Sequence, residues 1–200
     1  MPWSEDHKQT TRERIVAAAA AAIREHGPDG VSVAAIMKRA GLTHGGFYAH
    51  FASKEALITA ALAHAMAGTL DWLDTTAAQT TGEDLPGVAD IADAYLSPLH
   101  FEHPERGCPL AACGAEFARA DEEVRTACGE SVHAYLRWLG QHSQSAKRAE
   151  RAQEATGALA AMIGGMILAR AAADPAESRR ILAAVRGFVR RATGDGQQGD

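Results

Sequence analysis

Small and polar side chains that could hydrogen-bond to nucleic acid gather in a short stretch between Thr43 and Lys54. The stretch contains no acidic residue, so a phosphate backbone could approach it without repulsion. Hydroxyl, imidazole, phenol and ammonium groups can position a protein on phosphates or read base edges. The candidate positions are Thr43, His44, Gly45, Gly46, Tyr48, His50 and Lys54.

The elements that must hold these residues are two short helices joined at a glycine. The first helix has apolar residues at i, i+3, i+4 and i+7, which are Val33, Ile36, Met37 and Ala40. Ser32 is a candidate N-cap, and Gly41 can take the left-handed conformation that closes the helix. A second segment starts at Thr43 and buries Phe47 and Phe51. This arrangement predicts a helix-turn-helix whose second helix enters the major groove.

A third helix begins at Ser53, a candidate N-cap, and places Lys54 in its first turn. A lysine there is disfavoured by the helix dipole unless an anion is near. Beside a phosphate, the lysine and the helix terminus attract the same group. The alternative is that Lys54 is an ordinary solvated surface charge.

The segment before the helix-turn-helix predicts a supporting helix. Thr10 and Glu13 have the spacing of a capping box, so we expect this helix to begin there. Gly27 and Pro28 end it. The alanine run from 17 to 22 is flanked by charged residues and lacks a cleavage site, which favours a buried helix over a signal peptide.

The run GLTHGGFYAHFASKEAL resembles the signature of the TetR family of bacterial transcriptional regulators. The resemblance covers residues 11–70 and implies that Thr43, His44, Gly45, Tyr48, His50 and Lys54 face DNA. Two positions depart from the family pattern, because many members carry Lys or Arg where His44 stands and a bulkier residue where Gly46 stands. Base preference therefore does not carry over from relatives.

Composition suits a protein of one or two domains, since 46% of the 200 residues are hydrophobic. No apolar run approaches the roughly 20 residues of a membrane helix, so we expect a cytoplasmic protein without a membrane partner. The net charge is −5, and residues 1–64 carry seven Lys or Arg against six Asp or Glu. DNA affinity must therefore come from a few well-placed cations, doubled by dimerisation.

The rest of the chain predicts more helices, and no strand pattern occurs. The expected helices cover residues 88–99, 108–120, 121–144, 149–173 and 177–193. The fold class is therefore all-α. We expect a helix-turn-helix DNA-binding domain over 11–70, a helical ligand-binding and dimerisation domain over 71–193, and a disordered tail over 194–200.

The last two expected helices carry apolar stripes with glycines between them. Glycine costs about 1 kcal/mol against alanine in a helix, so Gly164 and Gly165 indicate close helix approach. Packing within the chain is one explanation, and dimerisation, which the TetR resemblance implies, is the other. The candidate dimer contacts are Met162, Ile163, Met166, Ile181, Val185 and Phe188.

By the same resemblance, the middle of the chain forms a small-molecule pocket. Its candidate lining is aromatic or sulfur-containing, although such residues at helical spacing more often form plain core. The candidates are Trp72, Tyr95, Phe101, Cys108, Phe117, Tyr135, Trp138 and Met162. An apolar or aromatic effector would suit them.

Cys108 precedes Pro109 and lies near a helix N-terminus, which stabilises a thiolate. The Gly107-Cys108-Pro109 step also resembles a sub-group of TetR-like regulators. Three cysteines in a cytosolic chain indicate reduced thiols, not disulfides. Cys108 is either structural or a redox sensor. His100 and His103 near it fit no established metal-site spacing, and no cofactor is expected.

Enzyme motifs are missing from the sequence. His44-Gly45-Gly46 matches part of an esterase oxyanion loop, but no G-x-S-x-G, GxGxxG, Walker or HExxH motif accompanies it. A helical adaptor without DNA binding is a further alternative, which outward Tyr48 and Lys54 argue against. The resemblance implies a repressor released from operator DNA by a small molecule. The alternative is a repressor that senses oxidants or electrophiles through Cys108.

Overall fold

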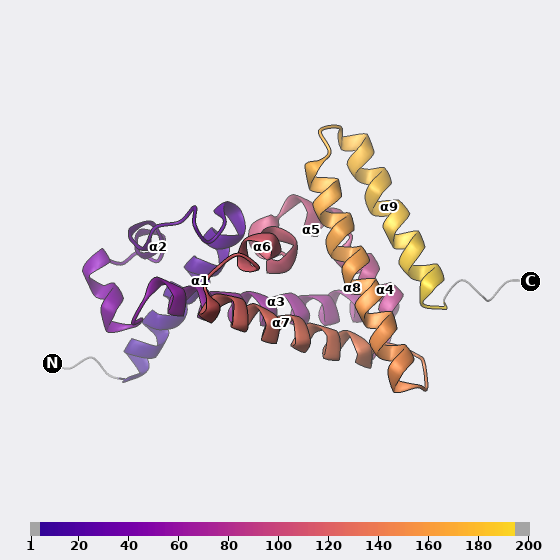
Figure 1. Cartoon of the computed structure of the whole chain (residues 1–200), viewed down its shortest axis with the longest axis horizontal. Coiled ribbons are helices and arrows are strands. Elements are labelled where there is room, and N and C mark those ends of the chain that lie inside the picture. Colours follow the sequence, from indigo (N-terminus) through magenta and orange to yellow (C-terminus); the bar gives the residue numbers. More distant parts are fainter. Residues whose placement is uncertain (1–4, 195–200) are drawn as a thin grey trace, which may run out of the picture. The chain divides into compact units, whose positions relative to one another are not determined.

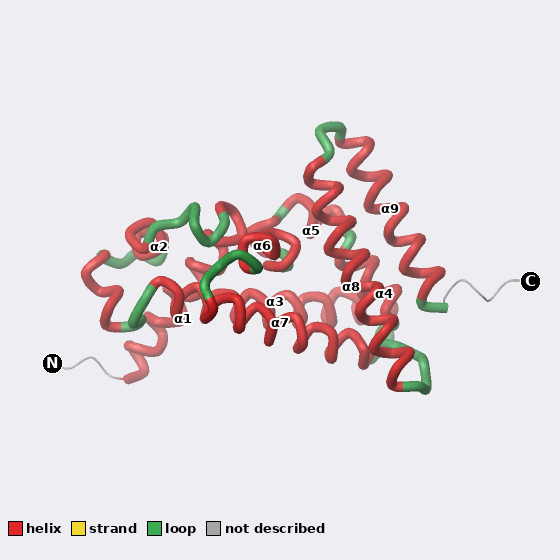
Figure 2. Tube along the Cα trace, viewed as in Figure 1, coloured by secondary structure: helices red, strands yellow, loops and turns green. Residues whose placement is uncertain are grey.

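The computed structural model describes residues 5–194, which form helices joined by loops and turns (Figure 2). No strand occurs in this part of the chain, so the all-α prediction is confirmed. The contacts divide the chain into two compact units. The N-terminal unit holds residues up to 67 together with 104–131, and the C-terminal unit holds 68–103 with the residues from 132 onward.

The N-terminal unit is built from α1 (Glu5–His26), α2 (Val33–Arg39), the 3₁₀ helix η1 (His44–Ala49) and the first half of α3 (Lys54–Thr81). The 3₁₀ turn η2 (Pro104–Arg106), α6 (Pro109–Phe117) and the start of α7 (Glu122–Gln141) complete it. Its core is formed by apolar faces of α1, α2 and α3, with Ile15, Ile36, Phe47 and Leu57 at most 1% exposed.

Residues from α6 and α7 join this core although they are far away in sequence. Cys113, Phe117 and Val124 pack into the same apolar cluster as α1, and the Cys113 thiol donates to the carbonyl oxygen of Ile23 at 3.1 Å. Residues 104–131 therefore group with the N-terminal unit, whereas the sequence placed them in a domain over 71–193. Long-range burial, which local periodicity does not encode, causes the difference.

The first helix also differs from the prediction. It runs from Glu5, and the hydroxyl of Thr10 donates to the carbonyl oxygen of Asp6 inside the helix at 2.9 Å. Thr10 is thus an interior helix residue and not an N-cap. The expected tail over 194–200 falls almost entirely outside the described residues.

The C-terminal unit contains α4 (Val88–Tyr95), α5 (Pro98–Glu102), α8 (Arg148–Ala171) and α9 (Pro175–Ala192), with the remaining parts of α3 and α7. The helix expected from residue 88 was to end at Ser97-Pro98 or shortly after, and α4 ends just before this step. Ser97 then caps a new helix, α5, through the backbone amide of His100, with Pro98 at its first position. Figure 1 shows α8 and α9 side by side as an antiparallel pair.

Close approach of α8 and α9 depends on one glycine. A Cβ atom at Gly165 would lie only 2.9 Å from Cγ2 of Val185, so alanine does not fit without movement of one helix. At Gly164 and Gly157 the same construction meets no atom within 4 Å. The expectation of close helix packing at glycine therefore holds at Gly165 alone among these three.

Two helices, α3 and α8, are long and apolar enough to cross a membrane by length and composition. The expectation that no apolar run approaches the length of a membrane helix is therefore wrong for these two helices by that measure. In the structure, 44% and 39% of their most apolar windows are buried against protein, as expected for core helices of a helical fold.

Candidate nucleic-acid interface

The turn between α2 and η1 has the geometry that its sequence predicts. The hydroxyl of Ser32 accepts from the backbone amide of Ala35 at 3.2 Å and caps α2. Gly41 has φ +71°, and the amide of Leu42 donates to the carbonyl of Met37 at 2.9 Å. The left-handed glycine reverses the chain within one residue, which directs the following segment across α2.

The segment after the turn is a 3₁₀ helix and not the α-helix expected from its periodicity. Its amides bond three residues back, as Gly46 does to the carbonyl of Thr43 at 3.1 Å. Gly45 and Gly46 weaken α-helix formation here. Thr43 is the N-cap residue by backbone conformation, but its side chain makes no capping bond.

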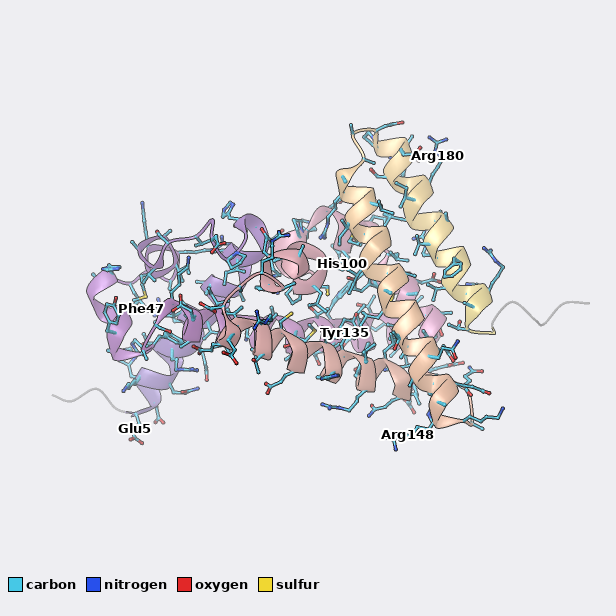
Figure 3. All side chains as sticks on the ribbon, in the orientation of Figure 1. Glu5, Phe47, His100, Tyr135, Arg148 and Arg180 are labelled. Atoms are coloured by element: carbon cyan, nitrogen blue, oxygen red, sulfur yellow. The ribbon has the colours of Figure 1, made fainter. Side chains whose placement is uncertain are left out.

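Two stacked phenylalanines anchor this segment to the core. Phe47 and Phe51 are 1% and 4% exposed, and their ring centroids lie 5.9 Å apart. Figure 3 labels Phe47 within the N-terminal unit. Tyr48 contacts the Phe47 ring edge-to-face at 5.1 Å and is itself 73% exposed. The anchoring fixes which side of η1 faces solvent.

The solvent side of η1 carries most of the sequence-predicted DNA-facing residues. Thr43, His44, Gly45 and Tyr48 are exposed. No heavy atom lies within 4 Å of a Cβ built on Gly45, so the backbone is open to a close partner there. Gly46 is half-buried, 3.8 Å from Cε of Met37 at the Cβ position. Gly46 therefore contributes to packing more than to the outer surface.

The start of α3 also fits its prediction. The hydroxyl of Ser53 accepts from the amide of Ala56 at 3.0 Å, which makes Ser53 the N-cap. Lys54 is half-buried in the first turn and has no hydrogen-bond or ion-pair partner among residues 5–194. A helix N-terminus with an unpaired lysine attracts anions.

Arginines on α1 and α2 link these two helices through hydrogen bonds. Nη2 of Arg14 donates to the carbonyl oxygen of Ala40 at 2.8 Å, at the end of α2. Arg39 makes a two-point contact with Glu25, at 2.5 and 2.9 Å. The hydrogen bonds from Arg39 lower the pKa of Glu25, so the carboxylate stays ionised to lower pH.

A hollow of about 490 Å³ lies between α1 and the turn. Lys8, Thr11, Thr43 and His50 contribute polar groups to its lining. Nδ1 of His50 is buried and has no hydrogen-bond partner among the described residues. Burial lowers the pKa of His50, and the charges of Lys8 and Arg12 act in the same direction. Lys8 and Arg12 therefore lie near the predicted DNA-facing residues.

Sequence reasoning missed Lys8 and Arg12 as members of this surface. They are four residues apart and share one face of α1. The i, i+4 spacing of Lys8 and Arg12 was not recognised because the helix was expected to begin at Thr10, which would have left Lys8 outside it.

The predicted effector-pocket residues do not all lie in one unit. Trp72, Tyr95, Phe101, Tyr135, Trp138 and Met162 belong to the C-terminal unit. Phe117 and Cys108 belong to the N-terminal unit, where Phe117 is part of the core cluster. Phe117 therefore packs as an ordinary core residue because α6 lies on α1.

The C-terminal unit contains two clusters in which aromatic rings contact a histidine. The His100 ring lies 4.5 Å from Tyr95 and 5.6 Å from Trp72. Trp138 contacts Tyr135 and His142, and its indole N–H donates to Asp74 at 2.9 Å. His142 faces acceptors on both ring nitrogens, the carbonyl of Pro86 at 2.8 Å and Asp74 at 3.2 Å.

The three cysteines lie in the N-terminal unit, and none of them forms a disulfide within residues 5–194. Cys108 is the N-cap of α6 and is fully buried, whereas reactive thiols are partly exposed. Burial raises the pKa of Cys113 to about 12 and also raises that of Cys128, which is only half-buried. Arg24 is the cation near Cys108, whereas Arg106 is exposed. No metal-binding group of three His, Cys, Asp or Glu occurs within residues 5–194.

The predicted dimer contacts divide into buried and accessible residues. Met162 and Met166 are fully buried within the single chain, so they are core residues and not surface contacts. Ile163, Ile181 and Val185 are half-buried. Phe188 is 55% exposed, and α8 adds exposed Ile167 and Leu168. The accessible apolar face of α8 is therefore rotated from the one that the sequence stripe indicated.

Comparison with known proteins agrees with this geometry. The family model for bacterial regulatory proteins of the tetR family matches residues 15–61, which contain the turn, η1 and the start of α3. An uncharacterized HTH-type transcriptional regulator of Bacillus subtilis (strain 168), YvdT, is 44% identical over 66 residues. The match spans 32% of this chain and 34% of the Bacillus protein, about a third of that relative's length.

Solved structures extend the likeness beyond the N-terminal unit. A TetR transcriptional regulator from Chloroflexus aurantiacus J-10-FL aligns with a TM-score of 0.73 and 26% identity, over 96% of this chain and 98% of that one. The segment over residues 15–61 therefore matches the tetR family of bacterial regulatory proteins, and the fold of the chain is that of solved TetR regulators. The reduced form of Escherichia coli NemR aligns with this chain at a TM-score of 0.71 and 23% identity, covering 91% of this chain and 96% of NemR, which shows a shared fold.

Proposed function

We propose that this chain is a DNA-binding transcriptional regulator of the TetR family whose recognition element is η1. The observation that carries the proposal is the exposed face of Thr43, His44 and Tyr48 on a segment anchored by Phe47. Unpaired Lys54 beside it would contact a phosphate, which fixes the register of the protein on DNA. Lys8 and Arg12 on α1 would add phosphate contacts.

Function would require two copies of the chain. Helix-turn-helix dimers read half-sites spaced about 34–36 Å apart, and a net charge of −5 leaves one domain with little general attraction for DNA. We propose a homodimer formed through exposed parts of α8 and α9, with Phe188, Ile167 and Leu168 at its centre. Half-buried Ile163, Ile181 and Val185 would extend the contact.

We further propose that the protein is a cytoplasmic repressor released by an apolar or aromatic small molecule. The effector would bind beside Trp72, Tyr95, Phe101, Tyr135, Trp138 and Met162 in the C-terminal unit. Near-complete release requires about 5.5 kcal/mol tighter binding to the DNA-incompetent state. We also assign the chain to the sub-group with the Gly107-Cys108-Pro109 step. The thiol-sensing alternative through Cys108 has less support, because Cys108 is fully buried.

Gel-shift titration against the DNA flanking the gene tests the proposal. Wild type should give a saturable, salt-sensitive shift with one fragment, and Lys54→Ala should weaken it on that fragment and on unrelated DNA alike. Arg125→Ala, which removes an exposed cation on α7, is the matched control and should bind as wild type. Absence of a shift with every fragment for wild type would instead favour a helical adaptor without DNA binding.

A further inference from the structure

A groove between the end of α7 and the start of α8 collects positive charge. It has a volume of about 790 Å³ and lies wholly within the C-terminal unit. His133, Arg137, Arg148 and Arg151 line it, and no acidic side chain does. We name it the arginine groove. Such charge is unexpected on a protein with a net charge of −5.

The helical hairpin formed by α7 and α8 explains why these arginines converge. Arg137 lies one turn before the end of α7 at Gln141, and Arg148 is the first residue of α8. Figure 3 shows Arg148 at the corner where the chain enters α8. Arg151 is one turn further, and its Nη1 donates to the carbonyl oxygens of Ser145 and Ala146 at 3.0 and 3.1 Å. These bonds hold one guanidinium in a fixed position beside the groove.

The other two guanidiniums have no partner among residues 5–194. Arg137 and Arg148 make no hydrogen bond or ion pair within the part of the chain that the structure describes. By contrast, Arg170 and Arg186 of the same unit donate to backbone carbonyls, and Arg180 and Arg190 pair with carboxylates. Two unpaired arginines in one groove leave most of their N–H donors available to a ligand.

No acidic side chain lines the groove itself, although Glu154 accepts a hydrogen bond at 2.6 Å from the hydroxyl of Ser143, a lining residue. Glu150 and Glu154 line a different groove, and they bond Lys147 and Ser143 respectively. The start of α8 is thus divided into an acidic side and a basic side. A cation in the first turn reduces helix stability through the dipole, so the charge of Arg148 at the start of α8 is not explained by helix stability.

We propose that the arginine groove binds a small molecule that carries a phosphate or diphosphate group. Guanidinium matches phosphate oxygens in two-point hydrogen bonds, and the volume is in the range of small-molecule sites. Leu136 and Ala152 form apolar parts of the lining, against which a non-polar part of the ligand can rest. None of its lining residues belongs to the proposed DNA-binding surface or to the aromatic residues proposed for the effector.

Calorimetric titration of the full chain with pyrophosphate, at constant ionic strength, tests the proposal. Arg137→Gln/Arg148→Gln should weaken binding by at least about tenfold, because two charged hydrogen-bonding groups are lost. Arg137→Lys/Arg148→Lys keeps the charge without the two-point geometry. Its affinity for pyrophosphate should therefore lie between those of wild type and the glutamine variant. The matched control, Arg119→Gln/Arg125→Gln, removes two exposed, unpaired arginines of the N-terminal unit and should bind as wild type.

Each of the following results would overturn the proposal. Equal weakening in the control pair would mean a general charge effect, and unchanged binding in Arg137→Gln/Arg148→Gln would place the anion elsewhere. Absence of pyrophosphate binding to wild type at millimolar concentration would leave no phosphate site. If the groove pair instead weakened binding to operator DNA while Lys54→Ala kept its own effect, the groove would be a DNA contact. That outcome refutes this inference and leaves the proposed function standing.

Discussion

The guanidinium of Arg14 donates a hydrogen bond to the carbonyl oxygen of Ala40, 2.8 Å away, and so links α1 to the end of α2. The carbonyl belongs to the last turn of α2, where no amide within the helix can satisfy it. The contact lies directly before Gly41, so it holds the residue at which the chain turns toward η1.

Replacement of Arg14 by methionine should lower the free energy of unfolding by about 1–2 kcal/mol. Methionine keeps the aliphatic packing and removes the donor. Urea denaturation followed by circular dichroism measures the change. Gln9→Ala, which loses only an exposed bond to Glu13, is the control and should stay within about 0.5 kcal/mol of wild type. Equal stability of both variants would show that the Arg14 contact contributes nothing.

Lys54→Ala should reduce the slope of log affinity against log salt by about 2 in a dimer, one phosphate contact per subunit. Tyr48→Phe should weaken binding to all sequences equally without changing the slope, since a hydroxyl carries no charge. Fluorescence anisotropy at several salt concentrations measures both. An unchanged slope for Lys54→Ala together with altered base preference would mean that Lys54 reads a base edge.

Gly45→Ala should stabilise the domain, since alanine favours helix by about 1 kcal/mol and the Cβ position is open. If DNA approaches the backbone closely at Gly45, affinity should fall as stability rises. Thermal unfolding and gel-shift on the same samples separate the two effects. Gly68→Ala, another helical glycine in open space but on α3, should raise stability without loss of affinity. Unchanged affinity in Gly45→Ala would mean that DNA does not approach the backbone closely at Gly45.

The sequence predicted the N-caps of α2 and α3 and the turn between α2 and η1, because each of these features is determined within a few residues. Ser32, Gly41 and Ser53 act on backbone groups three or four positions away, so their cap and turn roles can be seen without the fold. Phe117 could not be placed in the same way, since its periodicity reveals a buried face but not the helix that covers it. Its partner, α1, lies about ninety residues earlier.

A stripe of apolar residues likewise does not show whether it packs within its own chain or against a partner subunit. Met162 and Met166 have the spacing of an interface, and the structure buries them inside the chain. The sequence therefore predicted that α8 and α9 exist as helices. It did not predict which side of each helix is exposed, because that side is determined by how the helices pack against the rest of the chain. The helix start at Glu5 was missed because Thr10 and Glu13 imitate a capping box.

Phe188→Glu should give folded monomers with lost operator affinity, because a charge would enter the proposed interface. Met166→Glu should instead unfold the chain, since the carboxylate would be buried without a partner. Light scattering and circular dichroism distinguish the two. Leu85→Glu, at a residue that is 61% exposed outside α8 and α9, is the control and should remain as wild type. A dimeric Phe188→Glu variant would place the interface elsewhere.

Thiol accessibility should follow burial. Cys128 is half-buried, so it should react first with a disulfide reagent in the native protein, while Cys108 and Cys113 stay protected. Absorbance kinetics should lose the fast phase in Cys128→Ser and keep it in Cys108→Ser. A Cys108→Ser variant that lost the fast phase, and with it the response of DNA binding to peroxide, would support thiol sensing.

The contact between Gly165 and Val185 restricts how this protein can vary between species. With 2.9 Å between Val185 and the place of a side chain at Gly165, neither residue can enlarge alone. Related chains that carry alanine at the first position should carry a smaller side chain than valine at the second. The two positions should therefore co-vary, and Gly164, which faces open space one residue earlier, should drift independently of both.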